Sequence, residues 1–567
     1  RVEREYTPLQ KRLDQLGKTL GVVALAVAAL IFILGVIKGE PLYLMLMTAV
    51  SVAVAAVPEG LPAVVTITLA LGAQRMLARN ALIRKLPAVE TLGSVTTICS
   101  DKTGTLTVNR MTVTVLDIAG HRLDVNEEMR GEMLVCRNED ASTRATLDPA
   151  LSLLLAGGAL CNDAVLKKDS EGFDTVGDPT EGALVVAAAK FGLKKDELES
   201  ALPRVAELPF DSDRKRMMTV HEFPRESSLV PTTLRQTMNG YLPRGAGIAP
   251  FISFVKGSVD GLLDVSTHAW EHGRRVALTP EIRARIERAN DSLAENGMRV
   301  LGFAFRLLDR PSEAGRTENL ERELIFVGLV GMIDPPRTEV REAVAKCKQA
   351  GIRPVMITGD HPLTARFIAQ DLGIMNGGRV VTGAELERMT DGELRASVEE
   401  VSVYARVSPE HKFRIVGALQ SRGHVVAMTG DGVNDAPALK KANIGVAMGI
   451  TGTDVSKEAA EMVLRDDNFA TIVAAVEEGR TIYDNLRKFI KFSIAGNIGK
   501  ILTVLVGPLI GMPLVLQPLQ LLWLNLLTDG LLGLGLGVEK SERNVMRRPP
   551  ARPEDGIFSG GLTRHIV

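Results

Sequence analysis

The sequence predicts an α/β domain with a parallel sheet, an α+β domain inserted into it, and an all-α membrane part at the two ends of the chain. Three observations lead to this prediction. Short apolar runs end in an acidic or hydroxyl side chain, as at Asp101, Thr358 and Asp431. Over residues 113–330 strand and helix patterns mix, and no long apolar run occurs. Long apolar runs without charged residues lie towards the two ends, which is typical of membrane helices.

Length, charge and cysteine content narrow the possible classes of protein. A chain of 567 residues is too long for one hydrophobic core, so two or more domains are expected. The formal net charge of −1 gives no reason to expect binding to nucleic acid or a polybasic membrane surface. No obligate protein partner can be inferred from the sequence. The four cysteines are scattered and form no Cys-x-x-Cys pair, which favours buried thiols in a reducing compartment.

Apolar runs predict four membrane helices. They occupy residues 20–37, 42–57 with an extension over 61–71, 492–509 and 514–536, and each approaches the roughly 20 residues that span a bilayer. The more polar segments beside them are expected to be stalks that lead to soluble domains: residues 1–19, 72–93 and 470–488.

The second apolar run is interrupted by Val54-Ala55-Ala56-Val57-Pro58-Glu59-Gly60-Leu61-Pro62. Proline and glycine break the hydrogen bonding of a membrane helix, and freed carbonyls are tolerated only where they line a cavity. Carbonyl oxygens with the carboxylate of Glu59 make a hard-oxygen site suited to calcium. The alternative is a kinked helix end from which Glu59 reaches water.

A phosphoryl acceptor is predicted where a short apolar run, Ser94 to Cys99, reads as a strand that delivers Asp101 to a Thr/Gly turn. A carboxylate at the C-terminal end of a parallel strand can act as a nucleophile. Lys102 can neutralise phosphate charge, and the turn after it can hold phosphate oxygens. The alternative for an isolated aspartate is a helix cap.

Two later strand ends repeat this design. Arg353 to Ile357 leads to Thr358-Gly359-Asp360, and Val425 to Met428 leads to Asp431, followed by Asn434 and Asp435. Lys412 lies between them at the start of a predicted helix. Three strand ends of one sheet can therefore bring carboxylates, a hydroxyl and a lysine together.

The segment Asp101-Lys102-Thr103-Gly104-Thr105-Leu106-Thr107 resembles the phosphorylation signature of P-type ATPases, and the strand-end pattern resembles the haloacid dehalogenase class of phosphotransferases. The resemblance implies that Asp101 attacks the γ-phosphate of ATP. It implies that Asp101, Asp431 and the carbonyl of Thr103 hold Mg²⁺. The remaining catalytic positions that it implies are Lys102, Thr358, Gly359, Asp360, Lys412, Asn434 and Asp435.

Residues 113–330 contain aromatic and basic residues that could bind a nucleotide, since an aromatic face stacks on adenine and cations meet phosphates. Taken singly, each could be an ordinary surface charge or packed aromatic. In their order they resemble the nucleotide-binding domain of the same pumps. The resemblance makes Phe210 the adenine-stacking residue and places four further side chains around the nucleotide: Glu181, Lys215, Lys256 and Arg299.

Polar side chains in the last two apolar runs resemble the ion ligands of type II calcium pumps. Asn497 and Lys500 share one helix face, and Asn525, Thr528 and Asp529 follow in the next run. Polar contacts between helices are the alternative. The implied ligands of the transported ion are Val54, Ala55, Val57, Glu59, Asn497, Asn525, Thr528 and Asp529.

Lys500 departs from the family pattern, because two-site calcium pumps have a glutamate at the matching position. A protonated lysine cannot bind a cation, so Lys500 is expected to act as a tethered charge, pairing with Asp529. The resulting expectation is ATP-driven transport of one Ca²⁺. The alternatives are a pump for Mn²⁺, Na⁺/K⁺ or H⁺, a soluble phosphotransferase, and a non-catalytic nucleotide-binding remnant.

The resemblance also predicts the domain limits. The third and fourth family membrane helices lie in residues 1–93. The phosphorylation domain comprises 94–112 and 331–469, with the nucleotide-binding domain at 113–330. A stalk, the fifth and sixth helices and a loop fill 470–567. The chain starts without methionine and contains no Thr-Gly-Glu-Ser motif, so we expect a fragment of a multi-pass protein of a bacterial plasma membrane, with cytoplasmic catalytic domains.

Overall fold

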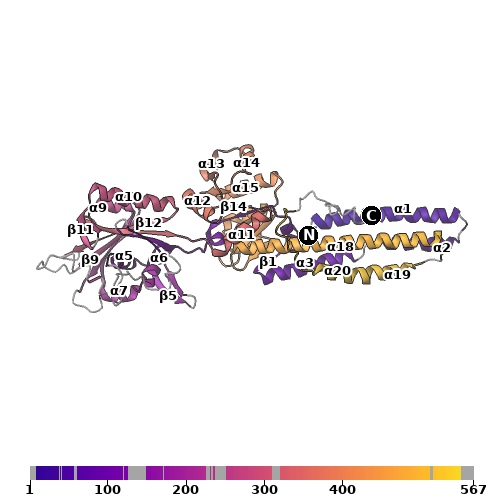
Figure 1. Cartoon of the computed structure of the whole chain (residues 1–567), viewed down its shortest axis with the longest axis horizontal. Coiled ribbons are helices and arrows are strands. Elements are labelled where there is room, and N and C mark those ends of the chain that lie inside the picture. Colours follow the sequence, from indigo (N-terminus) through magenta and orange to yellow (C-terminus); the bar gives the residue numbers. More distant parts are fainter. Residues whose placement is uncertain are drawn as a thin grey trace. The chain divides into compact units, whose positions relative to one another are not determined.

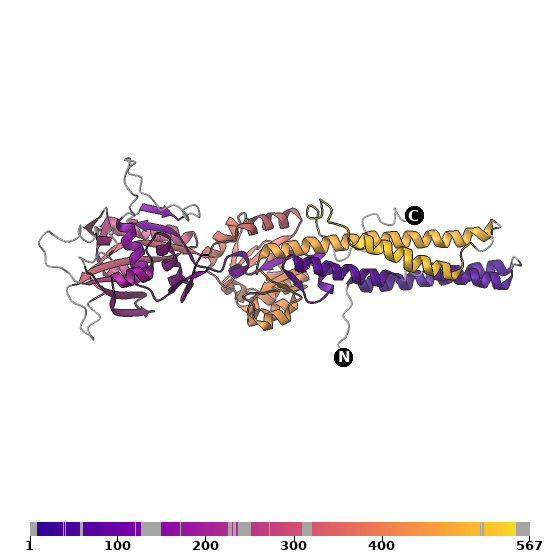
Figure 2. The same cartoon turned by 90° about the horizontal axis from the view of Figure 1, so that it is seen from below.

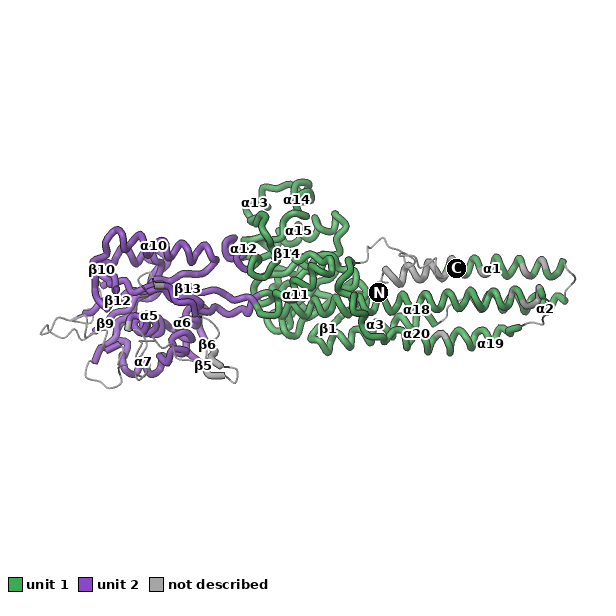
Figure 3. The backbone as a smooth tube through the Cα atoms, viewed as in Figure 1, with its two compact units in different colours: residues 1–106, 337–360, 369–567 green, residues 107–336, 361–368 purple. Residues whose placement is uncertain are grey.

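The computed structural model describes residues 8–37, 39, 41–56, 60–118, 121–125, 149–169, 172–224, 230, 234–235, 251–271, 273–308, 320–510, 512 and 515–550. The chain divides into two compact units, coloured separately in Figure 3. Unit 1 contains residues 1–106, 337–360 and 369–567, and unit 2 contains residues 107–336 and 361–368. The domain limits given above remain a prediction.

Unit 1 contains an eight-stranded sheet in the order β1-β19-β18-β17-β2-β14-β16-β15. All neighbouring pairs are parallel except β1 and β19. The strands are β1 (Ala81–Ile83), β2 (Thr97–Ser100), β14 (Arg353–Ile357), β15 (Val380–Thr382), β16 (Val403–Ala405), β17 (Val426–Gly430), β18 (Ile444–Met448) and β19 (Met462–Leu464).

Helices connect the parallel strands, as this topology requires. All four residues of β2 are buried, as expected of a strand inside a parallel sheet. The helices and turns are α4 (Pro87–Gly93), the irregular turn Lys102–Leu106, α11 (Thr338–Gln349), α12 (Pro362–Asp371, whose first residues belong to unit 2), α13 (Gly383–Arg388), α14 (Asp391–Ser397), α15 (Pro409–Ser421), the 3-10 turn Val433–Asp435, α16 (Ala436–Lys441) and α17 (Asp454–Ala459).

Long apolar helices form the rest of unit 1. Helix α18 packs against α2, α3 and α20, while α2 also packs against α1 and α19. Figures 1 and 2 show α18, in orange, running beside α3 and α20. Their bounds are α1 (Pro8–Ile37), α2 (Leu42–Ala56), α3 (Leu61–Ala78), α18 (Phe469–Leu509), α19 (Pro518–Trp523), a π-helical turn (Leu524–Thr528) and α20 (Asp529–Gly537).

Two helical segments of the described chain, Leu61–Ala78 and Pro518–Gly537, are long and apolar enough to cross a membrane by length and composition. Shorter apolar helical segments occur at Gly21–Ile37, Leu42–Val54 and Ala150–Leu160. The predicted stalk and the predicted span after it are one 41-residue helix, α18. Helix α2 ends at Ala56 and α3 begins at Leu61; the predicted break at Pro58 lies outside the described residues.

Unit 2 contains a nine-stranded sheet with the path β11-β10-β13-β12-β9-β8-β7, to which β3 and β4 are added beside β13, and a separate β5–β6 hairpin. The strands are β3 (Thr112–Ile118), β4 (His121–Asp124), β5 (Val165–Asp169), β6 (Gly172–Val176), β7 (Arg204–Asp211), β8 (Arg216–Glu222), β9 (Phe251–Gly257), β10 (Ser266–Glu271), β11 (Arg274–Ala277), β12 (Arg299–Leu308) and β13 (Leu324–Ile333). The helices are α5 (Pro149–Leu160), α6 (Pro179–Lys190), α7 (Lys195–Ala201), α9 (Val259–Val265) and α10 (Pro280–Glu295).

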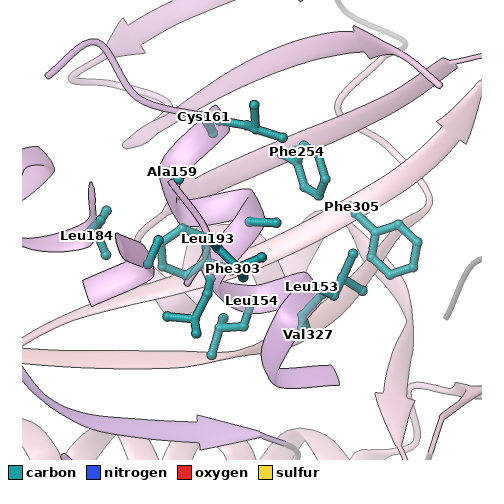
Figure 4. Close-up of a cluster of buried hydrophobic side chains, with 14 of the residues drawn as sticks. Leu153, Leu154, Ala159, Cys161, Leu184, Leu193, Phe254, Phe303, Phe305 and Val327 are labelled. Carbon is teal, nitrogen blue, oxygen red and sulfur yellow. The ribbon is translucent and has the colours of Figure 1, made fainter. Parts of the chain in front are cut away.

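Each face of this sheet carries its own hydrophobic core. Every residue of β13 is buried, and alternate residues of a strand point to opposite faces. Ile325 and Val327 belong to one core with residues of α5 and α6, and Figure 4 shows Val327 there beside Leu153 and Phe305. Leu324 belongs to the second core, with residues of α9 and α10.

The predicted fold class is confirmed: a parallel phosphorylation-type sheet, a mixed insert and an apolar helical part are all present. The described cysteines, Cys99, Cys161 and Cys347, are free and buried, as predicted. Burial raises the pKa of the Cys99 and Cys347 thiols to about 12. Cys136 lies outside the described residues.

A buried histidine makes the stability of unit 2 depend on pH. His221 is fully buried in β8, with Nδ1 2.9 Å from the carbonyl oxygen of Leu202 and Nε2 2.9 Å from Thr219 Oγ1. Burial lowers the pKa of His221 from 6.5 to about 4. Below pH 6.5 the unfolded chain therefore binds a proton that the folded chain does not, and folding loses about 3 kcal/mol by pH 4.

This loss can be measured from the fluorescence of Trp270, which is buried in the core that also contains Phe254, a ring in edge contact with His221. In a Trp523→Phe background, which leaves Trp270 as the remaining tryptophan, urea midpoints are measured between pH 7 and 4. We expect His221→Gln to flatten the fall in midpoint, while His361→Gln, which changes an exposed histidine, keeps it. An equal fall in urea midpoint in the two variants would contradict the assignment of this pH dependence to His221.

Candidate functional site

Three predicted functional residues follow neighbouring strands of the sheet in unit 1. Strand β2 lies between β17 and β14, and all three run parallel. Asp101 follows β2, Thr358 follows β14, and Asp431 follows β17. The carboxyl ends of parallel strands meet at one edge of the sheet, where open α/β folds bind their ligands.

Asp101 is held from two sides. Its N–H donates to Thr429 Oγ1 at 2.9 Å, and its Oδ2 accepts from Lys412 Nζ at 2.7 Å. The side chain keeps 18% of its surface exposed, so a reactant can reach it. Directly after it the chain turns, with Thr103 extended and Gly104 at a φ of +75°, which favours glycine.

Lys412 connects two carboxylates. It lies in the first turn of α15, which Ser408 caps, and its Nζ donates to Asp435 Oδ1 at 2.8 Å as well as to Asp101. Burial alone would lower the pKa of Lys412, but the charges of Asp101 and Asp435 outweigh burial and raise it. Lys412 therefore stays protonated beside the candidate nucleophile.

A third carboxylate completes this group. Asp435 Oδ2 accepts from the N–H groups of Gly432 at 3.2 Å and Asp431 at 3.3 Å, which fixes the start of the loop. Burial, followed by the charges of Asp101 and Asp435, raises the pKa of Asp431. Three carboxylates beside one ammonium leave an excess of negative charge, which a cation can offset.

The donor set near Asp101 and Asp431 fits a hard cation such as Mg²⁺, which prefers carboxylate, carbonyl and water oxygens. Within the described residues no group of three His, Cys, Asp or Glu side chains forms a ready-made metal cage. A cation here would therefore depend on two carboxylates, a main-chain carbonyl and water. That composition matches the usual behaviour of Mg²⁺, which keeps several waters.

Lys102 and Asp360 form an ion pair. The ammonium group of Lys102, which was predicted to neutralise phosphate charge, therefore already contacts a carboxylate. Thr358 is buried, and its Oγ1 accepts from the N–H of Asp360 at 3.2 Å. A side-chain carbon added at Gly359 would meet nothing within 4 Å, so space is open beside it. Asn434 is exposed on the loop after β17.

Two supporting residues received no role from the sequence. Thr429 holds the main chain of Asp101, and Arg337 donates from Nη2 to the carbonyl oxygen of Gly104 at 3.1 Å. Thr429 lies in the segment that leads to Asp431, which the strand pattern singles out. The contacts themselves join residues far apart in the chain, which no local pattern reveals.

The predicted nucleotide residues lie largely at one end of the sheet in unit 2. In the strand register, Arg216 at the start of β8 opposes Gly257 at the end of β9, and Gly257 opposes Gly302 near the start of β12. Phe210 near the end of β7 is 65% exposed, so its ring is free to stack. Lys215, in the turn after β7, is also exposed.

Two contacts link helix α6 to this end of the sheet. Glu181 forms an ion pair with Lys256, and Arg299 donates to Thr180. The helix is capped by Asp178, whose Oδ1 accepts from the N–H groups of Thr180 at 2.8 Å and Glu181 at 3.2 Å. Glu181, Lys256 and Arg299 are therefore held close to the β9–β12 pair.

The structure joins two predicted ion ligands, Asn497 and Asn525, to Lys500, the predicted tethered charge. Lys500 Nζ donates to Asn525 Oδ1 at 2.7 Å and to Asn497 Oδ1 at 3.4 Å, while Asn525 Nδ2 donates to the carbonyl oxygen of Val54 at 3.1 Å. Thr528 is exposed. Val57, Glu59 and the side chains of Ala55 and Asp529 lie outside the described residues, and so does the predicted Lys500–Asp529 pair.

Three family models match parts of the chain. Residues 150–339 match the cytoplasmic domain N of P-type ATPases. Residues 259–443 match the haloacid dehalogenase-like hydrolases. Residues 513–567 match the C-terminus of cation transporting ATPases. The matches cover parts of both units.

Curated relatives match almost the whole chain. A calcium-transporting ATPase 1 of Bacillus cereus is 47% identical over 98% of this chain and 58% of its own length. A calcium-transporting ATPase of Bacillus subtilis is 46% identical over 99% of this chain and 60% of its own. A probable cation-transporting ATPase F of Mycobacterium bovis is 43% identical over 99% and 60%. The chain thus spans 58% to 60% of the length of these relatives.

Proposed function

The chain belongs to the P-type cation ATPase family, and from this membership we propose that the whole protein uses ATP to move a cation across a membrane through an aspartyl-phosphate at Asp101. The observation that carries the proposal is the contact of Asp101 with protonated Lys412, beside Asp431 and Asp435 at the carboxyl edge of the sheet. In this arrangement a carboxylate nucleophile and positive charge lie where a phosphoryl group can be received.

In the proposed reaction an oxygen of Asp101 attacks the γ-phosphorus of ATP in line, and the bond to the bridging oxygen breaks as ADP leaves. Lys412 attracts the negative oxygens of the transferred group, and the Thr358 hydroxyl is available beside them. Asp101, Asp431 and the carbonyl of Thr103 would hold Mg²⁺, which supplies positive charge against the phosphate oxygens when bound.

The insert is proposed to bind the nucleotide. Exposed Phe210 offers a face for adenine, and Lys215 is free to meet phosphate oxygens. Glu181, Lys256 and Arg299 complete the site as proposed above. In this proposal the phosphorylation domain, residues 94–112 and 331–469, carries Asp101. The nucleotide-binding domain, residues 113–330, binds ATP.

The transported ion is proposed to be a single Ca²⁺. The amide oxygens of Asn497 and Asn525 already accept hydrogen bonds from Lys500, so an ammonium group occupies the place of one cation. The main ligands of the ion would then be Glu59, Asn525, Asp529 and the carbonyls of Val54, Ala55 and Val57. Calcium is favoured because carboxylates and carbonyls are its usual ligands. We propose a bacterial plasma membrane, with the catalytic domains in the cytoplasm.

Changing Lys500 tests the single-ion proposal. Lys500→Glu replaces the ammonium with a carboxylate, so we expect the number of Ca²⁺ ions carried per ATP to rise from one towards two. Lys500→Met is the matched control, because it removes the charge without adding a ligand, and one ion is expected. The measurement is ⁴⁵Ca²⁺ uptake against ATP consumed in vesicles. Two ions in the unchanged protein would refute the proposal.

The activity as a whole is tested in a chimera of the Bacillus subtilis relative that carries residues 1–567 in place of its matching region. Uptake into vesicles is measured with Ca²⁺, Mn²⁺, Na⁺ and K⁺ in turn. ATP-dependent uptake of Ca²⁺ alone is expected. If another cation is taken up and Ca²⁺ is not, that cation is the substrate. If ATP is hydrolysed without uptake of any cation, the result favours a phosphotransferase.

A further inference from the structure

The residues on both sides of Lys215 are tied to one buried carboxylate. Glu321 is 5% exposed, accepts from Arg216 Nε at 3.0 Å and pairs with Arg214 Nη1. Arg214 also donates from Nη2 to the carbonyl oxygen of Pro209 at 2.9 Å. One arginine therefore connects Glu321 to the main chain immediately before Phe210.

The turn that carries Lys215 has a backbone conformation that depends on its surroundings. Lys215 has a φ of 54°, in the left-handed region that non-glycine residues rarely adopt. Asp211 Oδ1 accepts from the N–H groups of Asp213 and Arg214, both at 2.9 Å, and the carbonyl oxygen of Lys215 accepts from the N–H of Ser258 at 3.0 Å. These bonds fix the main chain, whereas Glu321 fixes the side chains around it.

Two arginines side by side repel each other unless an anion lies between them. Glu321 supplies that anion, and its burial strengthens the attraction because water screens it little. Without its charge, Arg214 and Arg216 would be free to turn towards water, and Arg214 would no longer be directed at Pro209. The turn would then sample several arrangements of Phe210 and Lys215.

From this geometry we infer that Glu321 is a positioning residue for nucleotide binding, which holds Phe210 and Lys215 ready before ATP arrives. The inference rests on the proposed function, since it takes this turn as the nucleotide contact. A site that is competent for only a fraction of the time loses affinity by that fraction. Glu321 is expected to act on affinity and not on the chemical step at Asp101.

The test compares Glu321→Gln, which keeps the shape and removes the charge, with the unchanged 567-residue chain. We expect the Kd for MgATP, measured by calorimetry, to rise about tenfold. The maximal phosphorylation of Asp101 at saturating ATP should change less than twofold. The KM for p-nitrophenyl phosphate, which has no adenine, should not change. The matched control is Glu323→Gln, because Glu323 is 70% exposed and pairs with Arg306; its Kd should stay at the original value.

The outcomes separate the inference from the proposed function. If Phe210→Ala raises the Kd and Glu321→Gln does not, the inference is wrong and the nucleotide site stands. If Phe210→Ala leaves the Kd unchanged, the proposed nucleotide site is wrong. If Glu321→Gln fails to fold, Arg216→Gln is used to test the inference. This variant removes one of the two arginine partners of Glu321 and keeps Arg214. A smaller rise in Kd is then expected, and an unchanged Kd overturns the inference.

Discussion

Replacing Lys412 with methionine is expected to slow phosphorylation of Asp101 about a thousandfold. Lys412 Nζ lies 2.7 Å from Asp101 Oδ2 and 2.8 Å from Asp435 Oδ1, and its pKa is raised, so it carries a full positive charge at neutral pH. A single preorganised charge of this kind contributes about 10²–10³ in rate to similar reactions. Its loss also leaves neighbouring carboxylates to repel the incoming phosphate.

The rate is measured by rapid quench with labelled ATP at saturating concentration. Lys440→Met is the matched control, because Lys440 is an exposed lysine on α16 close in sequence to the same loop. The control should phosphorylate at the original rate. A Lys412→Met variant that does the same would show that this lysine only stabilises the fold.

Replacing Arg480 with methionine is expected to lower the free energy of unfolding of unit 1 by about 3 kcal/mol. Arg480 is buried and donates to the carbonyl oxygens of Val545 (3.1 Å), Arg548 (2.8 Å) and Ala350 (3.0 Å). It therefore joins α18 to the end of α11 and to the segment after α20. Carbonyl groups left buried without a donor cost about 1–3 kcal/mol each, less where water reaches them.

Burying the charge of Arg480 itself costs free energy. Removing this charge in Arg480→Met therefore offsets part of the expected loss of stability. Burial, with Arg548 close by, lowers the pKa of Arg480 to about 10, so no carboxylate compensates the guanidinium fully. Urea unfolding of the detergent-solubilised chain measures the change. Arg547→Met, at an exposed arginine in the same segment, is the control. Equal midpoints for the two variants would contradict the role of Arg480.

The strand ends of unit 1 could be predicted because each combines a short apolar run with a polar residue, a pattern that survives without tertiary information. The sequence therefore led to Asp101, Thr358 and Asp431, and the structure brings their strands together.

Contacts between distant segments could not be predicted in this manner. Glu321 meets Arg216 from 105 residues away, and its own surroundings in sequence look like an ordinary charged loop. The predicted stalk and span left open whether the helix continues through residue 490, because the composition changes there from charged to apolar. No proline interrupts the helix before Pro508, so the backbone continues through that change.

We expect Asp101 to be phosphorylated by ATP under control of the transported cation. The most direct test is acid-stable labelling with γ-labelled ATP in the chimera, with Ca²⁺, Mn²⁺, Na⁺ and K⁺ titrated separately and Asp101→Asn as the blank. We predict label on the peptide that contains Asp101 at micromolar Ca²⁺, and none in the blank. Label that persists in Asp101→Asn, or no label under any cation, would contradict the account.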